Sequence, residues 1–195
     1  MSEMRLFNIN GQRLYLNAEE RDKFLTAAAD LPPEKRAFAE FLHFTGCRIS
    51  EALEVVPERI EVSQARITIR SLKKRRDDIY RTIPVPPAFA DSLERTFSIK
   101  ARQARPRQRQ ARLWPWHRHY GWEIITGIMK AAGIPPGPHR CPKGLRHGYG
   151  IAAITAGVPL NILQHLMGHA DLSTTAIYAN AMGQEQAEIV ARMWN

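Results

Sequence analysis

The sequence predicts a mainly α-helical fold with one small three-stranded antiparallel sheet, within the α+β class. Through most of the chain, apolar residues recur at spacings of three and four, which is the period of a helix with one buried face. Between residues 60 and 85 they instead alternate with polar residues, which is the period of a strand. The composition of the 195 residues, 44% hydrophobic and 24% charged, excludes a disordered or fibrous chain and favours a globular domain with a sizeable core.

Three helices are expected in the first part of the chain. Asn17 and Glu20 have the spacing of a capping box, which opens the first helix. Pro33 suits the first turn of the second helix, which ends near Gly46. The third helix is short and is expected over 49–54.

Three short strands follow where branched apolar residues alternate with polar ones. They are centred on Ile60/Val62, Ile67/Ile69 and Ile79/Ile83/Val85. The last two are connected by SLKKRRDD (71–78), a very basic stretch that is expected to form the exposed tip of a hairpin.

The chain is expected to be helical again from residue 87 to its end. The predicted helices cover roughly 87–97, 118–132, 142–156, 159–168, 171–179 and 184–194. Residues 100–112 carry six basic residues among Gln and Pro and are interpreted as an exposed basic loop. The whole chain, 1–195, is expected to be one domain, with residues 1–13 as an N-terminal extension and residues 183–195 as a tail helix.

The chain is strongly basic, with 28 Lys and Arg residues against 19 Asp and Glu residues and a net charge of +9. A surplus of this size on one domain favours a polyanionic partner, most often nucleic acid. A basic solvated surface would have the same composition, so the distribution of the charge matters more than its total.

The cysteines and the N-terminus indicate a soluble, intracellular protein. Cys47 and Cys141 are too few and too far apart for the disulfide framework of a secreted protein. The first residues lack the basic start and apolar run of a signal peptide. The longest uncharged stretch, from Arg146 to Asp171, is broken by Gly, Pro and polar residues, so no membrane span and no membrane partner are expected.

Four segments carry residues suited to phosphate chemistry. In TGCRISEAL (45–53), Arg48 precedes a short helix and Glu51 stands one turn later, where it can hold the guanidinium, although such a pair alone is common on protein surfaces. The hairpin tip is the second segment, and its cations can either enter a groove of DNA or remain solvated. These cations are Lys73, Lys74, Arg75 and Arg76.

The third segment is CPKGLRHGYGIAAITAG (141–157), which predicts a helix. Its expected apolar stripe consists of Leu145, Tyr149, Ala152, Ala153 and Ala156. Lys143 and Arg146 are expected to project together from the other side, near the positive end of the helix, where an anion is stabilised. Gly148 and Gly150 each cost ~1 kcal/mol relative to Ala inside a helix, which predicts that a backbone or a nucleic acid packs very close to them.

The fourth segment is LQHLMGHADLSTTAIYAN (163–180). His169 follows a glycine at the end of a helix, and Tyr178 stands nine residues later on the next helix. Cations beside a tyrosine lower the cost of forming phenolate, and they neutralise the charge that builds on a phosphate under attack.

Together these segments resemble the tyrosine recombinase (phage integrase) family. TGCRISEAL resembles the family's first arginine box, the RHGYG helix resembles the second, and GHADLSTTAIY resembles the histidine-to-tyrosine box with its usual gap of nine. WPWHRHYGWEIITGIMKAAGI (114–134) is similar to the segment that the family carries ahead of the second box. The resemblance covers about residues 14–180 and implies the fold of the family's catalytic domain.

The resemblance implies a site-specific recombinase that cleaves and rejoins double-stranded DNA without a metal or a cofactor. Arg48 and Arg146 would hold the non-bridging oxygens of the scissile phosphate. Tyr178 would attack the phosphorus and keep the strand as a 3′-phosphotyrosine. His169 would donate a hydrogen bond to the phosphate or assist proton transfer.

A lysine of the hairpin would protonate the departing 5′-oxygen. Lys73 is the first choice because it follows the preceding strand directly, and Lys74 is the second. Glu51 would support the first arginine. Lys143 stands where the family more often has histidine, so that it would either accept the proton of Tyr178 or provide electrostatic support. The expected DNA contacts are Lys74, Arg75, Arg76, Arg105, Arg107 and Arg109.

Members of this family usually carry a separate helical DNA-binding domain, and only about 13 residues precede the catalytic segment in this chain. A stand-alone form, or an accessory DNA-binding protein that replaces the missing half, would account for this difference. The family further implies a homo-oligomer, a tetramer, on DNA in the cytoplasm, associated with the nucleoid. The tail helix would dock on a neighbouring subunit or fold back on its own domain through Ala187, Val190, Ala191 and Trp194.

Other interpretations use the same residues differently. A helix-turn-helix regulator would read DNA with residues 158–179, but it leaves Arg48, Lys143 and Arg146 without a task. An accessory protein of recombinase fold would bind DNA with little or no cleavage, and a type IB topoisomerase would use the same chemistry without choosing a site. The seven histidines and two cysteines show no spacing typical of a zinc site.

Overall fold

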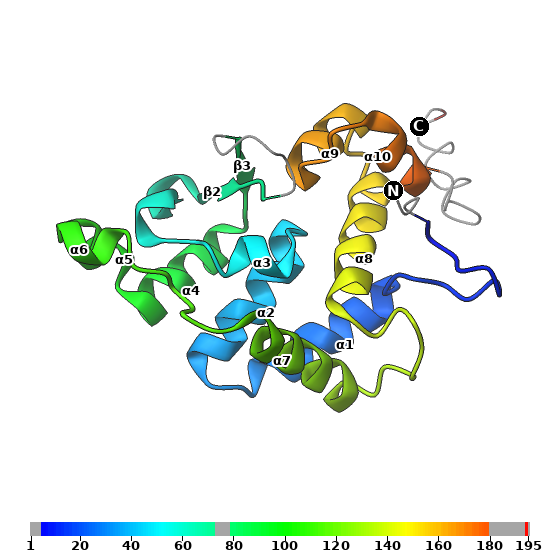
Figure 1. Cartoon of the computed structure of the whole chain (residues 1–195), viewed down its shortest axis with the longest axis horizontal. Coiled ribbons are helices and arrows are strands. Elements are labelled where there is room, and N and C mark those ends of the chain that lie inside the picture. Colours follow the sequence, from blue (N-terminus) through cyan, green and yellow to red (C-terminus); the bar gives the residue numbers. More distant parts are fainter. Residues whose placement is uncertain (1–4, 73–78, 180–193, 195) are drawn as a thin grey trace.

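The computed structural model describes residues 5–72, 79–179 and 194. Helices account for most of this part of the chain, and a small sheet lies against them (Figure 1). The α-helices are α1 (Ala18–Ala29), α2 (Pro33–Thr45), α3 (Ile49–Ala52), α4 (Pro87–Phe97), α5 (Ile99–Gln103), α6 (Pro106–Arg109), α7 (Arg118–Ala131), α8 (Pro142–Thr155), α9 (Leu160–Met167) and α10 (Leu172–Ala179). The strands are β1 (Ile60–Glu61), β2 (Arg66–Arg70) and β3 (Tyr80–Pro84), with 3-10 turns at Pro57–Arg59 and Val62–Gln64. The predicted fold class is confirmed.

The predicted helix starts are confirmed by their caps. The backbone N–H of Glu20 donates to Asn17 Oδ1 at 2.9 Å, and the N–H of Asn17 donates back to Glu20 Oε2 at 3.1 Å, which completes the capping box of α1. Pro33 occupies the first turn of α2, and Gly46 ends that helix in the left-handed conformation at φ 57°. Helix α3 ends at Ala52, two residues earlier than expected.

The three strands pair in the order β1-β2-β3, and both pairings are antiparallel. Ile67 stands opposite Ile83, and both side chains are fully buried. The predicted sheet is therefore confirmed. The tip between β2 and β3, with Lys73, Lys74, Arg75 and Arg76, lies outside the described residues, as do most of the tail residues 183–195.

Two apolar clusters hold the described residues together. The larger joins α1, α2, α4, α7 and the sheet around aromatic residues such as Phe38, Phe41 and Trp114. The smaller lies among the last three helices and consists of Leu6, Ile151, Ile154, Leu163, Met167 and Tyr178. Leu6 shows that the N-terminal segment packs onto this second cluster.

The expected basic loop at 100–112 is wrong in one respect, because α5 and α6 form within it. The segment folds back onto the turn that precedes β1, where Gln103 Nε2 donates to the carbonyl oxygens of Pro57 and Ile60 at 2.8 Å each. Ile99 is buried beneath it. Most of the basic residues are exposed, as predicted.

The expected apolar stripe of α8 is also partly wrong. Ala156 is exposed, whereas Ile151 and Ile154 are buried and belong to the smaller cluster. The reason is that α8 passes between both clusters and is covered on more than one side. Among the described residues, no helix combines the length and the apolar character that a bilayer crossing requires.

The glycines of α8 permit close contacts that hold this helix in place. We expect Gly144→Ala to lower the free energy of unfolding by about 1–3 kcal/mol, as overpacking does, because the added Cβ would lie 1.9 Å from the carbonyl oxygen of His139. Gly127→Ala on α7 is the matched control: its Cβ would meet nothing within 4 Å, so helix propensity should raise the free energy of unfolding by ~1 kcal/mol. Urea titration monitored by circular dichroism measures both, and equal effects would contradict the close contact.

Candidate active site

Arg146 lies on α8 with its guanidinium buried. Its Nη1 donates to the carbonyl oxygen of Gly46 at 2.7 Å, and its Nη2 donates to the carbonyl oxygen of Met167 at 2.7 Å. Burial, and then the nearby charge of Arg48, lowers the pKa of Arg146 to about 10. The side chain therefore remains a cation at neutral pH, fixed by main-chain oxygens of two distant segments.

Arg48 lies at the start of α3, directly after the chain leaves α2 at Gly46. Its Nη1 donates to Glu51 Oε1 at 2.8 Å, and its backbone N–H donates to Glu51 Oε2 at 3.0 Å. The Arg48 side chain is 28% exposed, whereas that of Glu51 is fully buried. The predicted contact between the two residues is confirmed, and the Arg48 side chain stays partly exposed while making it.

Tyr178 lies on α10 with no solvent exposure at all. Its hydroxyl is 3.0 Å from His147 Nδ1, and its ring stacks on the ring of His169 with centroids 6.3 Å apart. A Cβ at Gly150 would lie 2.6 Å from the tyrosine ring. The close approach predicted at Gly150 is confirmed, but the approaching group is the side chain of the candidate nucleophile and not a backbone or a nucleic acid. At Gly148 the prediction of a backbone is confirmed, because a Cβ there would lie 2.5 Å from the carbonyl oxygen of Leu16.

His169 connects Tyr178 to the buried arginine. Its Nε2 is 3.0 Å from Nη2 of Arg146, and its Nδ1 is 2.9 Å from Oγ1 of Thr175. Because a guanidinium only donates, Nε2 must accept, so that Nδ1 carries the proton and donates to Thr175. In this arrangement Nε2 has no proton to give to a phosphate.

The ionisation of the cluster follows from its burial. Burial raises the pKa of Tyr178 well above its usual value, although Arg146 and Arg48 act in the opposite direction. Burial and the same two arginines lower the pKa of His169 to about 3, and burial, Lys143 and Arg146 lower the pKa of His147 to about 3. At neutral pH the tyrosine is a phenol beside two neutral imidazoles and two arginine cations.

Lys143 and Arg146 differ in their exposure. Lys143 is exposed at the first turn of α8, whereas Arg146 is buried one turn later. The arginines of the 100–112 segment are remote, because α6 lies at the opposite end of the molecule from α9 and α10 (Figure 1). In this segment Nε of Arg109 lies 3.4 Å from Oε1 of Glu58, and Nη1 of Arg105 donates to Oε1 of Gln108 at 3.4 Å.

Two residues that contact the candidate site, His147 and Arg81, were not predicted from the sequence. His147 follows Arg146 directly, and the spacing alone does not reveal that it faces α10. Arg81 lies on β3, fully buried, and its Nη2 donates to Glu51 Oε2 at 2.6 Å. A signal for Arg81 existed, because the alternation that buries Ile83 places residue 81 on the same buried face of the strand.

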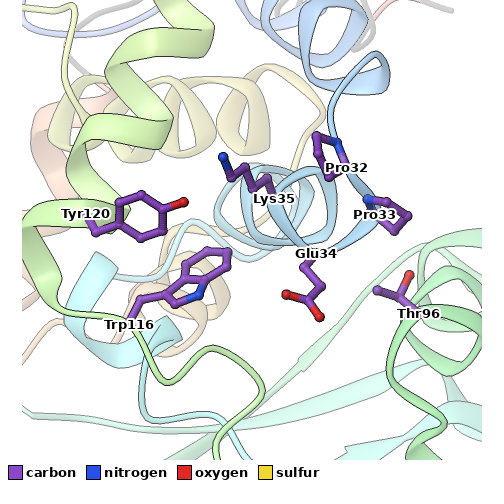
Figure 2. Close-up of a pocket in the computed structure, with 7 residues that line it drawn as sticks. All are labelled: Pro32, Pro33, Glu34, Lys35, Thr96, Trp116 and Tyr120. Carbon is purple, nitrogen blue, oxygen red and sulfur yellow. The ribbon is translucent and has the colours of Figure 1, made fainter.

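A separate hollow of about 440 Å³ lies at the start of α2 (Figure 2). It is lined by Pro32, Pro33, Glu34, Lys35, Thr96, Trp116 and Tyr120. None of these residues belongs to the candidate active site formed by Arg48, Arg146, His169 and Tyr178. Within the described residues, no group of three or more His, Cys, Asp or Glu side chains is arranged to hold a metal ion.

Comparison with known proteins gives the family. The sequence profile of the phage integrase family matches residues 14–185. Tyrosine recombinase XerA of Pyrococcus furiosus is 28% identical over 183 residues, which cover 91% of this chain and 60% of that protein. The chain thus spans about 60% of the length of this relative.

Solved structures share the fold. The XerH site-specific recombinase in a post-cleavage complex with a palindromic difH substrate aligns with a TM-score of 0.74 at 24% identity, over 99% of this chain and 57% of that one. The catalytic domain of bacteriophage HP1 integrase aligns with a TM-score of 0.66 at 19% identity, over 92% of this chain and 95% of that one. By its match over residues 14–185, this chain belongs to the phage integrase family of tyrosine recombinases.

Proposed function

We propose that this chain is the catalytic domain of a site-specific recombinase that cleaves and rejoins double-stranded DNA. The observation that carries the proposal is the cluster of Arg48, Arg146, His169 and Tyr178, which unites residues more than 100 positions apart in the sequence. Membership of a family whose matched relative is named a tyrosine recombinase supports the same reading.

The proposed reaction uses the two arginines for charge and the tyrosine for attack. Arg48 and Arg146 bind the non-bridging oxygens of the scissile phosphate, where negative charge increases in the transition state. The phenolic oxygen of Tyr178 loses its proton to Nε2 of the neutral His169 and forms a bond to phosphorus, while the bond to the 5′-oxygen breaks and Lys73 protonates that oxygen. The covalent phosphotyrosine keeps the phosphoester energy for rejoining. Lys143 adds positive potential at the start of α8.

The burial of Tyr178 requires a rearrangement before the attack. A hydroxyl without solvent exposure cannot meet a phosphate, so the contact with His147 has to break when DNA binds. Helix α10 is eight residues long and is held by the smaller of the two apolar clusters, which makes it the part of the domain that moves at least cost. The same movement releases Nη2 of Arg146 for the phosphate and leaves Nε2 of His169 free to accept the proton of Tyr178.

The proposed DNA surface extends beyond the cluster. Lys74, Arg75 and Arg76 of the hairpin tip contact the backbone next to the cleavage point, and Arg105, Arg107 and Arg109 contact it further along the duplex. Recombination proceeds in a tetramer of this chain on paired sites, with an accessory DNA-binding protein as a further partner. The protein acts in the cytoplasm, at the nucleoid.

The assignment of the nucleophile is tested by Tyr178→Phe. We expect the variant to bind DNA and to lose all covalent adduct, because phenylalanine has no attacking oxygen. Nicked duplexes cut from the DNA that flanks the coding sequence trap the adduct, which a denaturing gel then reveals. An adduct at the wild-type level in the variant would reject Tyr178, and binding without adduct in the wild type would favour an accessory protein.

The role of the arginines is tested by comparing cleavage with binding. We expect Arg48→Ala to slow adduct formation about 10²–10³-fold, the usual loss for one transition-state donor, with a much smaller loss of DNA affinity. For the buried Arg146 the variant is Arg146→Lys and not Arg146→Ala, because lysine keeps a positive charge beside the carbonyl oxygens of Gly46 and Met167. Equal losses in rate and in affinity would instead identify plain phosphate contacts.

The general acid is tested with a modified leaving group. A 5′-bridging phosphorothiolate expels a thiolate that needs no proton, so Lys73→Ala should be slow on the ordinary phosphate and close to wild type on the phosphorothiolate. Lys74→Ala is the matched control and should show no such difference. Rescue of Lys74→Ala alone would move the assignment by one residue.

A further inference from the structure

Arg81 uses all three of its guanidinium nitrogens in hydrogen bonds near the candidate site. From β3, its Nη2 donates to Glu51 Oε2 at 2.6 Å, its Nη1 donates to Ser71 Oγ at 2.8 Å and its Nε donates to the carbonyl oxygen of Leu166 at 2.8 Å. The side chain is 2% exposed. One guanidinium thus reaches three different segments of the chain at once.

Two of these partners lead to different parts of the site. Glu51 holds both the side chain and the backbone N–H of Arg48. The carbonyl of Leu166 precedes that of Met167, which accepts a hydrogen bond from Arg146.

The end of α9 is also pressed against Arg81. A Cβ at Gly168, the residue before His169, would lie 2.9 Å from Nη1 of Arg81. The position of His169 therefore depends on this packing as well as on its own contacts.

A structural role alone does not account for an arginine at this position. The neighbours of Arg81 on the buried face of the strand are apolar, and replacing a buried ion pair by packed apolar side chains is often neutral or stabilising. The charge of Arg81 nevertheless matters for Arg48. Glu51 is a single carboxylate between two guanidiniums, so that its pairing with Arg81 leaves the charge of Arg48 available to an anion.

The ionisation of Glu51 agrees with this division of charge. Burial alone would raise the pKa of Glu51, but Arg81, followed by Arg48, lowers it below its usual value. The carboxylate therefore remains ionised inside the protein, and Arg81 is its main counter-charge.

We propose that Arg81 is a positioning residue for phosphate binding, acting through Glu51 on Arg48 and through the end of α9 on Arg146 and His169. This inference rests on the proposed function. Arg81 touches no reacting atom. It sets where the two phosphate-binding arginines stand relative to each other.

The experiment compares Arg81→Lys with Arg66→Lys, the same substitution on an exposed residue of the adjacent strand β2. Lysine keeps the positive charge, but its three donors sit on one nitrogen and cannot span the three segments that the guanidinium fork of Arg81 reaches. At saturating DNA we expect Arg81→Lys to slow adduct formation about 10²-fold, as misplaced catalytic groups do, with DNA affinity close to that of Arg66→Lys. Its melting temperature falls because buried hydrogen bonds are lost, so rates are compared at a temperature where circular dichroism shows both variants folded.

The second substrate carries a methylphosphonate at the scissile position, where a methyl group replaces one charged oxygen. With less charge to bind, cleavage depends less on the arginines, so the defect of Arg81→Lys should shrink towards the wild-type rate on this substrate. A purely structural defect would slow both substrates equally, and that outcome, or no defect at all, would overturn the proposal. Arg48→Ala should follow the pattern of Arg81→Lys.

A third measurement does not depend on cleavage. Amide hydrogen exchange over residues 45–53 should be faster in Arg81→Lys than in Arg66→Lys, because Glu51 would hold the Arg48 N–H less firmly. Unchanged exchange would overturn the placement of Arg48 by Arg81. Absence of any adduct in the wild type, with faster exchange in Arg81→Lys, would reject the proposed function while supporting that placement.

Discussion

The buried guanidinium of Arg146 is the constraint on which the rest of the site depends. A charge removed from water needs close acceptors, and loss of one partner of a buried charge typically costs about 3–5 kcal/mol. The acceptors here are main-chain oxygens of Gly46 and Met167, at the ends of α2 and α9. Those two helix ends must therefore meet at α8, and this meeting brings Arg48 and His169 to either side of Arg146.

Glycine makes the first of these ends possible. Gly46 stops α2 in the left-handed conformation, and the ring of Tyr149 packs so closely on it that a Cβ would lie 2.3 Å from a ring carbon. The turn delivers the carbonyl of Gly46 to Arg146 and, two residues later, starts α3 with Arg48. The left-handed conformation of Gly46 therefore helps to position both Arg146 and Arg48.

The sequence predicted the longer helices closely, including α8, which is covered on more than one side. The bounds of α4, α7 and α10 follow from the helical period, and the pairing of β2 with β3 follows from the alternation of apolar residues. The helices α5 and α6 escaped prediction because tertiary contacts, rather than an apolar face, stabilise them. For the site, Arg48, Arg146, His169 and Tyr178 were found from motif order, whereas Arg81 and His147 were not, because their partners lie on elements that only folding brings near.

The apolar residues form a large and a small cluster, and the two clusters support different residues of the candidate site. Glu51 and Arg48 are anchored beside the large cluster, whereas Tyr178 is itself a member of the small one. Small cooperative units open more readily than the domain as a whole. The reactivity proposed for Tyr178 is then governed by the local stability of α10 and the small cluster, which can change without altering the part of the fold that holds Arg48 and Glu51.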